Sequence, residues 1–80
     1  MFKLYPIPAK DHIFVDPNFQ STIQDVSITF FDLTGKPIKH ETFKGSVGPF
    51  RLDLDDMHSG VYILEIKQGQ LRNSRKITVQ

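Results

Sequence analysis

The sequence contains no cysteine, no strong excess of one charge and no long hydrophobic run. Without cysteine, neither a disulfide framework nor a thiolate metal site can supplement the core. Ten basic residues against nine acidic ones leave a net charge of +1, which is too small to suggest a nucleic acid partner. No apolar run approaches the roughly 20 residues that span a bilayer, so no membrane-spanning segment is expected.

The sequence also has few residues typical of a helical bundle, with only two methionines and little alanine. Its first residues lack the apolar core of a signal peptide, so an exported parent would carry its export signal elsewhere. What is present is a hydrophobic fraction of 39% with seven phenylalanines, which suits one packed core. We therefore expect a single domain over residues 1–80, with a thin stability margin because so short a chain buries only about 60% of its unfolded surface.

Apolar residues recur at every second position, and nowhere at helical spacing over a helix-length window. Val26, Ile28 and Phe30 form one such set, and Tyr62 and Leu64 begin another. Alternate residues of a strand point to the same face, so each set marks a buried face. The spacing predicts an all-β, Ig-like antiparallel sandwich. Its seven expected strands are Phe2–Tyr5, Asp11–Asp16, Asp25–Asp32, Lys36–Phe43, Pro49–Asp53, Gly60–Gln68 and Gln70–Val79.

Turn signals separate these strands. The segment 33–36 reads as a hairpin loop in which Gly35 takes a positive φ. A tight turn is expected at Gln68-Gly69. Residues 55–60 are expected to form a short 3₁₀-like turn that Asp55 caps, with Met57 covering the end of the core. Gly60 is likewise expected to be required as glycine.

No catalytic apparatus is evident. The three histidines, His12, His40 and His58, do not show the spacing of a zinc pair, and we expect them on the solvated surface. No serine lies in a G-x-S-x-G elbow, and no glycine loop suits phosphate. A sandwich of this size leaves little volume for a cleft. We therefore expect no enzyme activity and no cofactor.

Asp53, Asp55 and Asp56 form the densest acidic cluster, and a calcium-binding site is the obvious functional hypothesis for them. They do not fit the ligand positions of an EF-hand loop. A weak surface cation site is one interpretation, and turn capping is the alternative that we favour.

Two further groups have a structural and a functional interpretation. Lys67, Arg72, Arg75 and Lys76 gather in the final hairpin, either as the charges of a solvated edge strand or as a recognition stripe. The second group is out of phase with the core residues of its strands. Its members either form an exposed apolar docking patch or are covered by a sheet edge or a loop. It consists of Phe14, Phe31 and Ile63.

Five segments occur in an order that resembles a known family: 4–9 (LYPIPA), 31–36 (FDLTGK), 52–54 (LDL), 59–64 (SGVYIL) and 75–80 (RKITVQ). Together they are similar to the type A C-terminal sorting domain of the type IX, or Por, secretion system of Bacteroidetes. The resemblance spans essentially the whole chain. One departure is Ile7, where the family typically has asparagine between the two prolines. We expect an altered local turn there and an intact fold.

The resemblance implies a secretion signal on a larger exported protein whose cargo domain precedes it. An outer-membrane translocon would read the folded domain during passage from the periplasm to the cell surface. A sortase-like cysteine protease would then cut upstream of the sandwich. Tyr62 is expected to be buried with its hydroxyl hydrogen-bonded. The motif and partner-contact residues are Tyr5, Pro6, Pro8, Gly35, Lys36, Gly60, Tyr62, Arg75, Lys76, Ile77, Val79 and Gln80.

Other functions stay open at this point. An Ig- or fibronectin-like accessory module could bind carbohydrate or space the domains of an extracellular enzyme, and a small calcium-binding adhesion module is a third hypothesis. A small sandwich can also form a homodimer by pairing an edge strand.

Overall fold

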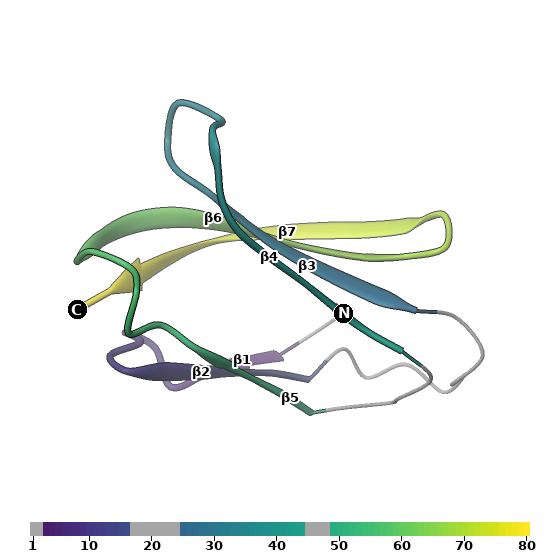
Figure 1. Cartoon of the computed structure of the whole chain (residues 1–80), viewed down its shortest axis with the longest axis horizontal. Helices are drawn as coiled ribbons and strands as arrows, with labels where there is room; N and C mark the ends of the chain where they lie inside the picture. The colour runs from purple at the N-terminus through teal and green to yellow at the C-terminus, as the bar shows by residue number, and fades with distance from the viewer. Residues whose placement is uncertain (1–2, 17–24, 45–48) are drawn as a thin grey trace.

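Every predicted strand is present in the computed structural model, which describes residues 3–16, 25–44 and 49–80 (Figure 1). The bounds differ from the predicted ones by one residue at most, and Phe2 lies outside the described residues. The strands are β1 (Lys3–Tyr5), β2 (His12–Asp16), β3 (Val26–Phe31), β4 (Pro37–Phe43), β5 (Phe50–Asp53), β6 (Gly60–Gln68) and β7 (Leu71–Val79).

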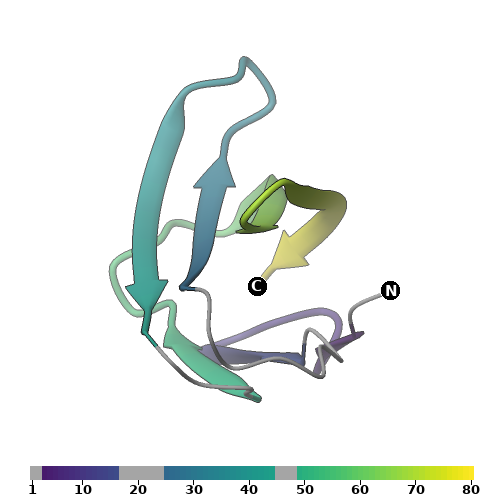
Figure 2. The same cartoon turned by 90° about the vertical axis from the view of Figure 1, so that its right-hand side faces the viewer.

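The strands form two antiparallel sheets, which confirms the all-β sandwich. The small sheet has the order β1-β2-β5 and the large sheet the order β4-β3-β6-β7. Figure 2 shows the two sheets as separate layers, with β4 and β7 at opposite sides of the large one. A constant-type immunoglobulin domain would place its fourth strand in the same sheet as the first, second and fifth. Here β4 instead continues the hairpin from β3 and joins the large sheet.

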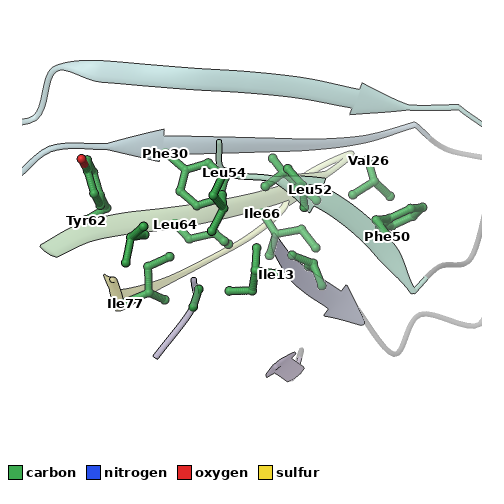
Figure 3. Packing of buried hydrophobic residues seen from close by; sticks show 14 residues of the cluster. Ile13, Val26, Phe30, Phe50, Leu52, Leu54, Tyr62, Leu64, Ile66 and Ile77 are labelled. Atoms are coloured by element: carbon green, nitrogen blue, oxygen red, sulfur yellow. The ribbon is translucent and has the colours of Figure 1, made fainter. Parts of the chain in front are cut away.

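The core lies between the sheets and comes from the alternating apolar residues of both. Figure 3 shows Phe30, Leu64 and Ile66 of the large sheet facing Ile13 and Leu52 of the small one. All five are buried, with at most 1% of their surface exposed. Because alternate strand residues share a face, the period-two pattern alone supplies this packing. Each side chain of this kind stabilises the fold by about 1.5–3 kcal/mol on burial.

The apolar docking patch, one of the two interpretations of Phe14, Phe31 and Ile63, does not exist as one surface. Phe14 lies on β2 of the small sheet, whereas Phe31 and Ile63 are directly paired on neighbouring strands of the large sheet. All three are half-buried on the outer faces of their sheets. The sequence left this open because a period of two indicates the face of a strand but not the sheet to which the strand belongs.

The loop between β5 and β6 carries the chain from the small sheet to the large one. The N–H of Met57 donates to the carbonyl of Leu54 at 2.9 Å and closes a single turn. Met57 packs against the core, as predicted. No helix occurs among the described residues, and so none there is long and apolar enough to cross a membrane.

Candidate functional site

The end of β7 is held by a residue from the beginning of the chain. The N–H of Ala9 donates to the carbonyl of Thr78 at 2.9 Å, and the N–H of Gln80 donates to the carbonyl of Ala9 at 2.7 Å. Together these bonds form an isolated parallel bridge between Ala9 and Val79. Ala9 is fully buried. Since β1 belongs to the small sheet, residues 3–9 connect both sheets of the sandwich.

The segment that leads to this bridge carries the two prolines of the opening motif. Pro6 and Pro8 are exposed, and the peptide bond before each of them is cis. Ile7, between them, exposes 53% of its surface, so no core contact depends on the residue at this position. Tyr5 is also exposed, at 43%, and its ring stacks on Phe14 with the ring centroids 5.5 Å apart.

The start of β6 lies beside the same end of β7. Gly60 pairs with Val79, and Tyr62 pairs with Ile77. Tyr62 is buried, and its hydroxyl donates to the carbonyl of His58 at 2.6 Å, which confirms the prediction. The hydroxyl therefore fastens the loop before β6 to the core.

Neither its φ nor the space around it requires a glycine at position 60. Its φ is not in the left-handed region, and an added Cβ would lie 3.8 Å from the Tyr62 ring, which is an ordinary contact. Gly35 behaves as predicted, because its φ is +90°. Only a glycine adopts such a φ without strain.

The loop of residues 32–36 is organised by Asp32, a residue of the 31–36 motif that was not among the predicted contact residues. Its carboxylate accepts the N–H of Thr34 at 2.9 Å, the Thr34 hydroxyl at 2.6 Å and the N–H of Lys36 at 3.0 Å. These bonds, above all the one from the Thr34 hydroxyl, lower the pKa of Asp32. An Asp followed by Thr and Gly is a known signal for such a turn and could have been recognised.

This loop stands apart from the other motif residues. In both views it projects above the large sheet, away from the chain end marked C (Figures 1 and 2). β6 lies between β7 and the two strands, β3 and β4, that this loop joins. Three of the other four motifs, at Ala9, Gly60–Tyr62 and the end of β7, do converge on one end of the sandwich.

The predicted contact residues of β7 divide between two faces. Ile77 and Val79 are 2% and 1% exposed, so their side chains belong to the core. Lys76 and Gln80 are exposed, while Arg75 is half-buried and lies opposite Leu64, whose side chain belongs to the core. In the folded domain, a partner can therefore reach the side chains of Lys76 and Gln80 but not those of Ile77 and Val79.

The final hairpin is basic on its outer face. Lys67 and Arg72 face each other across β6 and β7, and Lys76 lies further along the same face opposite Ile63. Arg72 approaches Glu65 at 3.5 Å. Arg75 belongs to the opposite phase of the strand, so the predicted group of four is a stripe of three with one residue turned away.

The acidic residues of the cluster near β5 pair with different basic side chains. Asp53 pairs with Arg51 at 3.1 Å, and Asp56 pairs with Lys39 at 3.0 Å, a hydrogen bond that lowers the pKa of Asp56. Among the described residues, no three acidic, histidine or cysteine side chains lie close enough together to hold a metal ion.

The histidines have specific neighbours. His12 hydrogen-bonds to Asp11 at 2.7 Å and packs edge-on against Phe14, and this hydrogen bond lowers the pKa of Asp11. His40 shares a hydrogen bond of 2.7 Å with the hydroxyl of Thr29. His12 and His40 are therefore part of the outer sheet surfaces.

Residues 3–80 match the model of the family described as the secretion system C-terminal sorting domain. The chain belongs to this family. No curated protein is similar enough to count as a match. The match confirms the resemblance seen in the ordered motifs, and it includes both partners of the bridge between Ala9 and Val79.

Because the chain belongs to this family, its general role is that of a type IX sorting signal rather than that of a catalytic domain. It implies a cargo on the same parent chain, a type IX secretion machinery that handles the parent, and export toward the cell surface.

Proposed function

We propose that the outer-membrane translocon of the type IX system recognises this sorting domain in its folded form. The observation that supports the proposal is the convergence of three of the five family motifs. Ala9, Gly60–Tyr62 and the end of β7 form one structured end of the sandwich, although the sequence separates them widely. A surface of this kind exists only after folding. The exposed groups that it offers include Lys76 and Gln80.

The proposal includes a later cleavage. A sortase-like cysteine protease removes the domain after transit through the periplasm, and the cargo is then anchored to the surface or released. β1 begins at Lys3 and is paired with β2. A cut within the sandwich would break such pairing, so the scissile bond lies upstream of it.

The test fuses residues 2–80 to a periplasmic reporter in a type IX-competent strain. We expect the fused reporter at the cell surface and the unfused reporter in the periplasm. Deleting residues 77–80 is not a clean test, because Ile77 and Val79 are core residues. Lys76→Gln is the better variant and should reduce surface delivery, with Lys44→Gln as a matched control for charge. Equal delivery of fused and unfused reporter would exclude the sorting function of this copy.

Cleavage has its own readout. In the competent strain, the mass of the surface reporter should lack the sandwich. In a strain whose sortase-like protease is inactivated, the mass should include it. A reporter that keeps the whole domain in both strains would contradict the proposed cleavage while leaving recognition untouched.

One observation favours a second candidate, an accessory module that binds carbohydrate. Exposed Tyr5 stacks on half-buried Phe14 on the outer face of the small sheet, next to His12 and Arg51. Aromatic rings offer an apolar surface on which the C–H face of a sugar can pack. A glycan array with the isolated domain tests this candidate, with Phe14→Ala as the control variant. Micromolar binding that Phe14→Ala abolishes would support it.

A further inference from the structure

β7 is an edge strand whose outward backbone groups can be identified. The carbonyl of Thr78 and the N–H of Gln80 bond to Ala9, so both point away from β6. Along a strand, the N–H and C=O of alternate residues point to the same side. The pairing of β6 with β7 is continuous from Gly60–Val79 to Gln68–Leu71, so the alternation is unbroken. The backbone groups of Arg72, Ser74 and Lys76 therefore point to the free edge.

This edge is occupied only at its end among the residues that the structure describes. The Ala9 bridge is isolated, and no other described residue pairs with β7 on that side. Arg72, Ser74 and Lys76 are all exposed. A run of donors and acceptors of this length is a ready template for an added strand.

The other edges are shorter and less uniform. β1 has three residues and is followed by Pro6, and β5 has four residues that carry the paired Arg51 and Asp53. β4 has seven residues, starts with a proline, and carries both Lys39 and Glu41. β7 has nine residues.

The charge on this edge has one sign. From residue 66 to residue 80 the chain contains Lys67, Arg72, Arg75 and Lys76 and no aspartate or glutamate. Glu65 of the neighbouring strand lies opposite Ser74 and approaches Arg72 at 3.5 Å. A second copy of β7 would place like charges opposite one another, which is destabilising. An acidic strand would place opposite charges there.

We propose that the free edge of β7, from Arg72 to Lys76, binds an extended acidic segment of a partner protein as an additional strand. The backbone groups of Arg72, Ser74 and Lys76 supply the hydrogen bonds, and the basic side chains select the acidic partner. That this partner belongs to the secretion machinery rests on the proposed function. The binding mode itself does not.

The test uses the 80-residue chain and a peptide of about ten residues that alternates threonine and glutamate. A peptide with lysine in place of glutamate is the control probe. We expect the acidic peptide to bind and the basic one not to bind. In amide hydrogen exchange, the N–H groups of Arg72, Ser74 and Lys76 should slow when the acidic peptide is bound. Those of Asn73 and Arg75 should change little, because they already face β6.

Two substitutions of Ser74 distinguish backbone pairing from simple charge attraction. Ser74→Pro removes an outward N–H, a change that an edge strand tolerates, and should weaken binding about tenfold. Ser74→Ala keeps the N–H and should bind as the parent does. Arg72→Gln together with Lys76→Gln should also weaken binding, whereas Lys44→Gln should not.

The proposal is overturned if the acidic peptide fails to bind. It is also overturned if Ser74→Pro folds and binds as well as Ser74→Ala, or if the outward amides gain no protection, since the attraction would then be charge alone. Dimers detected by light scattering that Ser74→Pro dissolves would equally overturn it, because a second copy would then occupy the edge. The export assay tests the sorting function separately. If the acidic peptide binds but variants that weaken this binding are exported normally, the binding site at the β7 edge stands and its link to secretion does not.

Discussion

Ala9 and Gln80 are joined by a backbone hydrogen bond of 2.7 Å, although they stand near opposite ends of the sequence. The contact is part of the only described pairing on the free side of β7. It places the opening motif of the family against its closing one. Both motifs are therefore parts of one structural unit, and a change in either is expected to affect the other.

Ala9→Leu is expected to lower the free energy of unfolding by about 1–3 kcal/mol, because a fully buried methyl group leaves no room for a larger side chain. Displacing the segment should also expose the N–H of Gln80 to faster hydrogen exchange. Urea unfolding measures the first effect and amide exchange the second. Lys10→Leu is the control, since Lys10 is exposed next to it and should change stability by less than about 0.5 kcal/mol. Equal stabilities for the two variants would contradict the close packing at Ala9.

Tyr62→Phe is expected to cost about 0.5–1.5 kcal/mol, because it removes the hydroxyl that donates to the carbonyl of His58 and leaves that part-buried carbonyl without this donor. Thermal or urea unfolding gives the value. Tyr5→Phe deletes the same atom from a tyrosine that is 43% exposed, and should change stability by less than about 0.5 kcal/mol. If both variants lose the same amount, the Tyr62 hydroxyl has no special role.

The two motif glycines should differ under the same substitution. Gly35→Ala is expected to cost about 1–2 kcal/mol, because alanine is strained at a φ of +90° even though no atom lies within 4 Å of the new Cβ. Gly60→Ala meets an ordinary contact at 3.8 Å and no positive φ, so it should be close to neutral. Chemical denaturation of the pair is the measurement. A larger loss for Gly60→Ala would show that its glycine is needed for a reason other than φ or space.

Acid should destabilise the domain through its hydrogen-bonded carboxylates. The pKa values of Asp11, Asp32 and Asp56 are lowered from 3.8 by hydrogen bonds to His12, Thr34 and Lys39, respectively. A lowered pKa in the folded state contributes stability that is present above the unfolded value and is lost as the pH falls through the folded one. The free energy of unfolding is therefore expected to fall as the pH drops from about 5 to below 3.8.

Asp32→Asn tests whether the Asp32 carboxylate contributes to this loss of stability in acid. The variant should lose stability at neutral pH, and the difference from the parent should shrink in acid, where Asp32 of the parent is itself protonated. Lys44→Gln, which alters no carboxylate, should keep the pH profile of the parent. A difference between Asp32→Asn and the parent that stays constant down to about pH 2.5 would mean that the charge of Asp32 is not involved.

The strands could be predicted well because the residues that specify each strand are neighbours in the sequence. A period of two, interrupted by glycine, proline and aspartate, is enough to place β6 from Gly60 to Gln68. The positive φ of Gly35 and the buried, bonded hydroxyl of Tyr62 followed from residue chemistry alone. The divided faces of Arg75 and Lys76 follow from the same period, since neighbouring residues of a strand point to opposite sides.

What the sequence did not reveal was how the strands combine. Nothing in the residues near Ala9 indicates that it pairs with Val79, because a single parallel bridge across the chain leaves no periodic pattern. The separation of Phe14 from Ile63 has the same origin, since membership in a sheet depends on long-range pairing. The candidate site at the end of the sandwich is made of such pairings, so its residues were identifiable singly but not as a group.

Because residues 3–9 are attached to both sheets, a cut within this segment would remove part of the folded structure. A break after Tyr5 would detach a strand from the small sheet, and a break after Ala9 would also remove the residue that bridges to the large one. A break before Lys3 removes none of these contacts. The contacts that the structure describes thus begin at Lys3, and a cut upstream of this residue would leave all of them in place.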